Sequence, residues 1–156
     1  MKKIILTMLL TMLTSVGAFA QTKFYETCRE IPQFETVYIG KSMLQMVNSS
    51  TLNIEGINLN SLVGKLESVQ VISAEKSKPG KKLKEMADKE FSPAKKYEIM
   101  LESHDEGDST TIYFKKISDK SNEYVLINSS TGDHETTVII LTGSITPEDL
   151  KNLRRL

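Results

Sequence analysis

The run Thr136–Gly143 constrains the fold of this chain more than any other stretch. It reads Thr-Thr-Val-Ile-Ile-Leu-Thr-Gly and is the longest β-branched apolar run outside the first twenty residues. β-Branched side chains pack well on a pleated sheet and lose rotamer freedom in a helix. We therefore predict that this run is a central strand of an antiparallel sheet.

The first twenty residues are typical of a targeting segment. Lys2 and Lys3 give a basic start, residues 4–16 are mainly apolar, and Ala18-Phe19-Ala20 has the small-x-small pattern of a cleavage site. The apolar stretch is shorter than the ~20 residues that a membrane-spanning helix needs. We expect a signal peptide over residues 1–20 and a soluble periplasmic or secreted chain after Ala20, with no membrane span.

Length and charge limit what the mature chain can be. Removing 20 of the 156 residues leaves 136, enough for one domain with one core. Without Lys2 and Lys3, 18 basic side chains stand against 20 acidic ones, a net charge of −2, which argues against nucleic acid as a partner. The single cysteine, Cys28, cannot form an internal disulfide. We interpret it as a bystander near the mature N-terminus, with an intermolecular disulfide as the alternative.

Hydrophobic periodicity predicts the element order β-α-α-β-α-β-β-β-β-α. We expect a flexible arm over residues 21–33 and a single α+β domain over residues 34–156. Strands at 34–39 and 69–72 alternate with helical patterns, the second of which should begin at Asn58, and these two strands can run parallel if they are neighbours. After Pro93 the period falls to two, and four strands form a meander that ends with Thr136–Gly143.

The last helix has a clear start signal. Thr146, Pro147 and Asp149 form a capping box with proline at the first helical position. The whole pattern gives an α+β, two-layer fold, in which helices cover one face of a mostly antiparallel sheet.

The meander strands are apolar on both faces. A sheet with one solvated face should alternate cleanly, but these strands do not. One interpretation is that the second face binds another protein or a second copy of this chain, and its candidate residues are Tyr113, Tyr124, Leu126, Ile139 and Leu141. The other is that the N-terminal arm or the surroundings of the first strand cover this face.

The turns of the meander hold the only two histidines. His104, Asp105 and Asp108 lie in the first turn region and His134 in the third, and both should share one rim of the sheet. Their spacing matches no known metal motif, and the strands that carry them are roughly 10 Å apart. A metal or small-ligand site at this rim is the alternative to a protein-binding face.

Motifs for catalysis do not occur in the sequence. It has neither a nucleophile elbow, nor a zinc-protease helix, nor a glycine-rich phosphate loop. We therefore expect a non-catalytic protein without a cofactor, and a hydrolase with an unrecognised site is the third hypothesis.

Several passages resemble one known family. They are residues 37–44 (Val-Tyr-Ile-Gly-Lys-Ser-Met-Leu), 65–69 (Lys-Leu-Glu-Ser-Val), 97–100 (Tyr-Glu-Ile-Met) and 141–145 (Leu-Thr-Gly-Ser-Ile). The family is catalogued as a domain of unknown function (forty-two fifty-two) and comprises small exported proteins of Gram-negative bacteria. The resemblance covers about residues 36–153. It implies a single exported domain without catalytic residues, and an envelope-stress or regulatory role.

The resemblance also implies a modification site. Bacteria of this group attach O-glycans at Asp-Ser/Thr followed by an apolar residue or Thr, and Asp108-Ser109-Thr110 fits this pattern. Ser109 is therefore a candidate glycosylation site, with an ordinary turn as the alternative.

Overall fold

The computed structural model describes residues 22–47, 52–54 and 56–151. The predicted signal peptide and its cleavage site lie outside these residues. No helix in the described part of the chain is long and apolar enough to cross a membrane.

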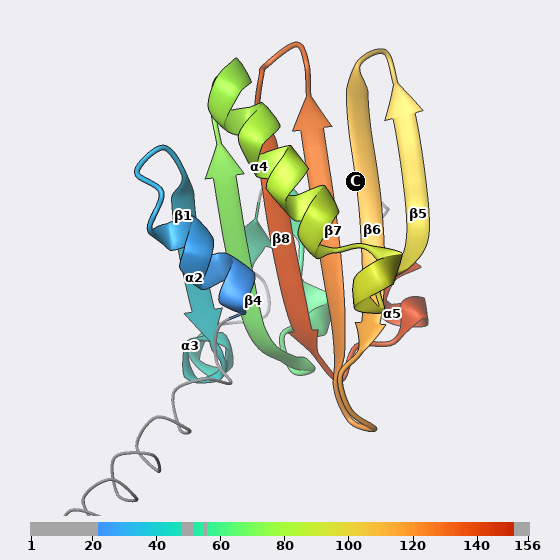
Figure 1. Cartoon of the computed structure of the whole chain (residues 1–156). Coiled ribbons are helices and arrows are strands. Elements are labelled where there is room, and N and C mark those ends of the chain that lie inside the picture. Colours follow the sequence, from blue (N-terminus) through green and yellow to red (C-terminus); the bar gives the residue numbers. More distant parts are fainter. Residues whose placement is uncertain (1–21, 48–51, 55, 152–156) are drawn as a thin grey trace, which may run out of the picture.

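A six-stranded antiparallel sheet forms the centre of the molecule, with strand order β1-β4-β8-β7-β6-β5 (Figure 1). Its strands are β1 (Glu35–Gly40), β4 (Leu66–Ala74), β5 (Glu98–Asp105), β6 (Asp108–Lys116), β7 (Asn122–Ser130) and β8 (Thr136–Gly143). β5 to β8 form the predicted meander, and β8 lies between β4 and β7. β1 and β4 are neighbours but run antiparallel, so the suggestion of a parallel pair was wrong.

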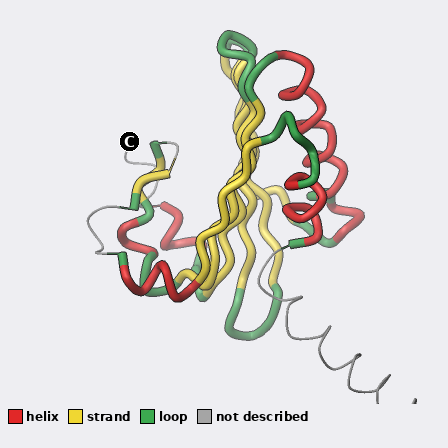
Figure 2. Tube along the Cα trace, turned by 90° about the vertical axis from the view of Figure 1, so that its left-hand side faces the viewer, coloured by secondary structure: helices red, strands yellow, loops and turns green. Residues whose placement is uncertain are grey.

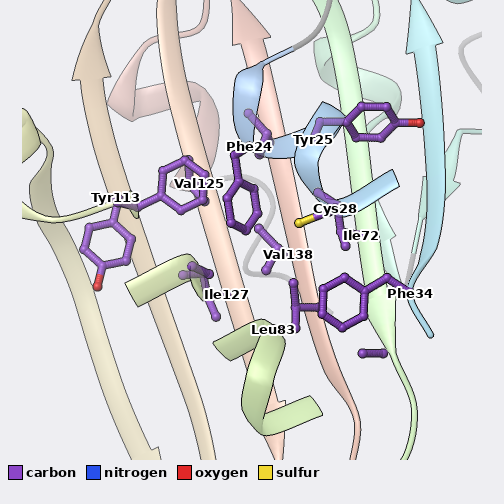
Figure 3. Packing of buried hydrophobic residues seen from close by; sticks show 14 of the residues in the cluster. Phe24, Tyr25, Cys28, Phe34, Ile72, Leu83, Tyr113, Val125, Ile127 and Val138 are labelled. Carbon is purple, nitrogen blue, oxygen red and sulfur yellow. The ribbon is translucent and has the colours of Figure 1, made fainter. Parts of the chain in front are cut away.

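Two helices cover the first face of this sheet. They are α2 (Lys23–Arg29) and the longer α4 (Ser77–Glu90), which a short 3-10 turn, η2 (Pro93–Lys95), follows. Their apolar side chains pack on β4, β8 and β7, and Figure 3 shows Phe24, Cys28 and Leu83 in this core. This arrangement confirms the predicted helical layer.

The expected flexible arm is wrong, because α2 lies within it. The backbone N–H and the hydroxyl of Thr22 both donate to Oε1 of Gln70 in β4, at 2.9 and 3.0 Å. The same hydroxyl caps the helix by accepting from the N–H of Tyr25 at 3.1 Å. Burial of three side chains then fixes a helix of only seven residues, which would be unstable alone.

Shorter elements cover part of the second face. They are α3 (Lys41–Met46), the hairpin of β2 (Asn53–Ile54) and β3 (Ile57–Asn58), the 3-10 turn η1 (Asn60–Leu62), and α5 (Pro147–Lys151). The helix predicted to start at Asn58 does not form. The Asn58 side chain accepts from the N–H of Asn60, and the Asn60 side chain accepts from the N–H of Leu52, so local bonds favour a turn.

The fold is therefore α+β with a mostly antiparallel sheet, as predicted. The second face differs from expectation because it carries a core of its own. Figure 2 shows the sheet from its edge, with α2 and α4 on one side and the shorter elements on the other.

Candidate functional site

The predicted interaction face is largely buried. Tyr124, Leu126, Ile139 and Leu141 lie on the second face, where each is at most 7% exposed. They pack with buried leucines of α3, η1 and α5, and the Tyr124 hydroxyl donates to the carbonyl of Ile145 at 3.1 Å. The alternative interpretation is correct in part, because α3, which follows the first strand, covers these residues together with η1 and α5, whereas the N-terminal arm lies on the other face.

Tyr113 does not belong to that set. It packs in the first-face core with Val125 and Ile127, on the other side of the sheet. Strand alternation places Ile112 and Phe114, rather than Tyr113, on the second face. The predicted face thus combined residues from two opposite sides.

The second face is not covered along its whole length. Figure 2 shows the covering elements beside the lower part of the sheet. The upper end, which carries the β5–β6 and β7–β8 turns, stands clear of them. A groove of about 510 Å³ lies at this boundary, over β5, β6 and β7 and against α5 and β3. Its lining residues are Ile57, Met100, Leu101, Ser103, Thr110, Ile112, Leu126, Asn128, Pro147, Leu150 and Lys151. We call it the second-face groove.

An irregularity in β5 adds apolar surface to this groove. The register with β6 shifts between Ile99 and Leu101, so that Ile99 pairs with Tyr113 and Leu101 pairs with Ile112. Ile99 therefore lies on the first face, whereas Met100 and Leu101 both line the groove. Strict alternation, which the sequence suggested for this strand, would have sent them to opposite faces.

The sheet surface beneath the groove changes in character along the strands. Cross-strand pairing aligns Leu101, Ile112, Leu126 and Ile139 in an apolar row. The next row toward the turns is polar and consists of Ser103, Thr110, Asn128 and Thr137. A third row pairs Asp105 with Asp108 and Asp108 with Ser130, beside Glu135. The surface thus passes from apolar to neutral polar to acidic.

A second, polar hollow continues the groove toward the acidic row. It has a volume of about 260 Å³ and is lined by Asp108, Ser109, Thr110, Asn128, Ser129, Ser130, Glu135 and Thr137. Thr110 and Asn128 line both hollows and pair across β6 and β7. The groove and the hollow are therefore adjoining parts of one depression on the second face.

The predicted loop rim exists, but its histidines do not converge. The N–H of Thr131 donates to the carbonyl of Gly107 at 3.2 Å, so the two loops touch. His104 instead approaches Glu102, with Nε2 and Oε1 3.2 Å apart, and His134 is exposed at a positive φ of 56°. The described residues contain no group of three or more such side chains that could hold a metal ion, so the proposed set His104, Asp105, Asp108 and His134 finds no support.

Ser109 lies in β6 and not in a free loop. It pairs with His104 on one side and Ser129 on the other, and it is partly exposed. Its glycosylation stays a prediction.

Cys28 belongs to the structural core. The thiol is fully buried beneath α2, and loss of solvation raises its pKa to about 11 (Figure 3). A protonated, inaccessible thiol is a poor nucleophile and a poor partner for disulfide exchange. The interpretation of Cys28 as a near-terminal bystander was wrong, and an intermolecular disulfide would require α2 to open.

A buried acid on the first face also serves the fold. The Tyr97 hydroxyl donates to Oε1 of Glu123 at 2.5 Å, and the Lys115 ammonium lies 4.8 Å from the centre of the Tyr97 ring. Burial raises the pKa of Glu123, while the Tyr97 hydrogen bond and the charge of Lys115 oppose that rise. This cluster ties the start of β5 to β6 and β7.

Comparison with known families agrees with the earlier resemblance. One family model, described as a domain of unknown function, matches residues 25–153. The chain belongs to this family, DUF4252. The DUF4252 match starts inside α2 and extends just past α5, so it includes all the elements that cover both sheet faces. No curated protein and no solved structure shows a significant match to the chain.

Sequence reasoning found Leu126, Asp105, Asp108 and Ser109 but missed most of the groove. A period of two places Met100 and Leu101 on opposite faces, and the bulge that brings them to the same groove leaves no distinctive mark in the sequence. Thr110 and Asn128 carried no signal, since their importance comes from pairing across β6 and β7. A correct register would have revealed the three rows.

Proposed function

We propose that this DUF4252 protein is an exported, non-catalytic interaction module that binds an extended segment of a partner protein in the second-face groove. The observation that carries the proposal is the groove itself, in which apolar side chains of β5 and β6 stay partly open to solvent beside the buried Leu126 and Leu150. Met100, which lines this groove, is 41% exposed.

Energetics favour a partner that fills this groove. Full burial of a Met, Leu or Ile side chain is worth about 1.5–3 kcal/mol. The groove offers Met100, Leu101 and Ile112 for further burial, with Leu150 of α5 at its side. Burial of these three side chains supplies at most about 4–9 kcal/mol before the cost of association, so the partner must gain further contacts in the polar part of the depression.

The polar row supports a peptide as the occupant. The hydroxyls of Ser103 and Thr110 and the amide of Asn128 can each donate and accept hydrogen bonds. An extended peptide needs such partners for its backbone N–H and C=O groups when water is displaced. A binding surface with apolar side chains beside hydroxyls and amides suits that need better than a purely apolar cleft would.

Export and process belong to the same proposal and depend on sequence alone. The basic start, apolar stretch and Ala18-Phe19-Ala20 of the first twenty residues support a periplasmic or secreted location. The family resemblance supports a place in envelope stress or regulation. A second copy of the chain remains an alternative occupant of the groove.

A matched pair of charged variants tests the proposal. Met100→Glu places a charge in the groove, while Ile99→Glu places the same charge on the opposite face of the same strand at a similar exposure of 49%. Ile139 and Leu141 are unsuitable because they are core residues whose charging would unfold the protein.

We expect the mature protein to retain specific partners from envelope extract, the Ile99→Glu variant to retain the same ones, and Met100→Glu to lose them. Thermal unfolding by circular dichroism checks that both variants are folded. Equal retention by the two variants would contradict a role for the groove.

A further inference from the structure

The acidic end of the depression is the feature that identifies a partner more closely. Asp105 and Asp108 stand directly opposite each other at the end of the β5–β6 hairpin, and Glu135 lines the hollow beside Asp108. None of these three acids takes part in an ion pair between residues that the structure describes.

Like charges that face each other across two strands repel and destabilise a hairpin. Asp105 and Asp108 therefore leave negative potential at the rim that a bound cation would relieve. Lys151 lies in the lining at the other end, on α5. Its ammonium lies 3.4 Å from Glu148, whereas the acidic side chains of the depression are gathered at its polar end.

The dimensions fit a short extended segment. The apolar, polar and acidic rows are two residues apart along β6, as Ile112, Thr110 and Asp108 show. A strand rises about 3.4 Å per residue, so the three rows span roughly 14 Å. An extended peptide covers that distance with about five residues, of which alternate side chains point toward the sheet.

We infer that the partner segment is an extended, amphipathic, basic peptide: apolar side chains against Met100, Leu101 and Ile112, followed toward the meander turns by lysine or arginine against Asp108 and Glu135. The inference rests on the proposed function, and it adds the chemistry and the orientation of the bound segment.

Selection from a random library of linear octapeptides displayed on phage tests this assignment. The mature protein serves as bait, and the pool is first depleted on the Met100→Glu variant. We expect enriched peptides to carry alternating apolar residues with lysine or arginine at one end only. Enrichment of apolar peptides without basic residues, or with acidic ones, would overturn the inference and leave the proposed function standing.

A synthetic peptide from the selection then measures the electrostatic contribution by fluorescence anisotropy. The double variant Asp108→Asn/Glu135→Gln removes two acids from the hollow. The control, Glu85→Gln/Glu102→Gln, removes two exposed acids, one from α4 and one from β5, that do not line the depression. We expect the first variant to weaken binding about tenfold at low salt, as two surface ion pairs allow, and the second by less than about twofold.

Equal weakening by the two double variants would overturn the inference, because it would reflect net charge alone. The absence of any peptides that distinguish the mature protein from Met100→Glu would contradict the proposed function as well. Binding that instead appears only as self-association of the protein would assign the groove to a second copy, which overturns the basic-peptide assignment.

Discussion

Met100 determines how much apolar surface one face of the sheet can offer. Because the register of β5 shifts at this residue, Met100 and Leu101 line the same groove while Ile99 points to the opposite face. A regular strand would place adjacent side chains on opposite faces. One extra residue in an edge strand therefore gives the second face two neighbouring apolar side chains.

Burial of Cys28 predicts an unreactive thiol. The side chain is fully buried, and burial raises its pKa to about 11, so the folded protein holds little thiolate at pH 8. We expect Ellman's reagent to label less than about a tenth of the folded protein within minutes and all of it in 6 M guanidinium chloride. Rapid complete labelling of the folded protein would show that α2 does not stay on the sheet.

Gly143 at the end of β8 allows a close backbone approach. A Cβ atom at this position would lie only 2.1 Å from the carbonyl oxygen of Lys65, and a backbone atom cannot yield as a flexible side chain would. We expect Gly143→Ala to lower the free energy of unfolding by about 1–3 kcal/mol in urea titrations. Gly132→Ala is the control, because its nearest neighbour would be 3.9 Å away. Equal stability of the two variants would contradict the close packing of β4 on β8.

At the scale of elements, α5 depends on local capping and on its docking to the rest of the chain. Its five residues are too few for a stable isolated helix. The N–H of Thr146 donates to Oδ2 of Asp149 at 2.8 Å, and the Lys65 ammonium donates to Oδ1 of the same carboxylate at 2.7 Å. Burial of Leu150 completes the docking and forms one side of the groove.

Removal of the Asp149 carboxylate should therefore loosen α5 in a pH-dependent way. The hydrogen bond from Lys65, followed by that from the backbone of Thr146, lowers the pKa of Asp149 from 3.8 to about 2. The ionised group stabilises the fold above its ordinary pKa, and this contribution is lost as the pH falls through 2. We expect Asp149→Ala to cost roughly 1 kcal/mol at pH 7 and progressively less below pH 4.

Urea titrations at pH 7, 4 and 2.5 measure this difference. Glu148→Ala is the matched control, because its contact with Lys151 is longer, at 3.4 Å, and fully on the surface. We expect that control to change stability by less than about 0.5 kcal/mol at every pH. A cost for Asp149→Ala that does not vary with pH would mean that the carboxylate acts through shape rather than charge.

Elements with strong local signals could be predicted from the sequence, and elements fixed by distant contacts could not. Thr146 and Asp149 mark α5 through a local capping box, and the apolar run of β8 marks a central strand. α2 is different, because Gln70, 48 residues away from Thr22, accepts its N-terminal hydrogen bonds. Residues 58–66 have helical spacing, yet side-chain bonds of Asn58 and Asn60 select a hairpin and a turn.

At the scale of the whole molecule, the two faces of the sheet have different coverage. The first carries α2 and α4 along the sheet, while the second is covered only toward one end (Figure 2). The sequence indicated an apolar second face, but it could not show which part of it stays open. That boundary depends on where α3, η1 and α5 return to the sheet, and these positions follow from tertiary packing.

The groove arises at this boundary, which explains why sequence reasoning reached the right face and the wrong residues. Tyr124, Ile139 and Leu141 lie under the cover and belong to the core. Met100, Leu101 and Ile112 lie where the cover ends. The same protein surface therefore provides stability at one end and, in our proposal, binding at the other.

Site-specific photo-crosslinking in the native host tests this central claim most directly. A benzophenone amino acid is introduced at Met100 in the groove or at Ile99 on the opposite face, and covalent products are identified by mass spectrometry after irradiation of cells. We predict a discrete product with another envelope protein from position 100, attached through an apolar and basic segment, and no such product from position 99. Products that are absent from both positions, or equal at both, would contradict the proposal that the second-face groove binds a partner.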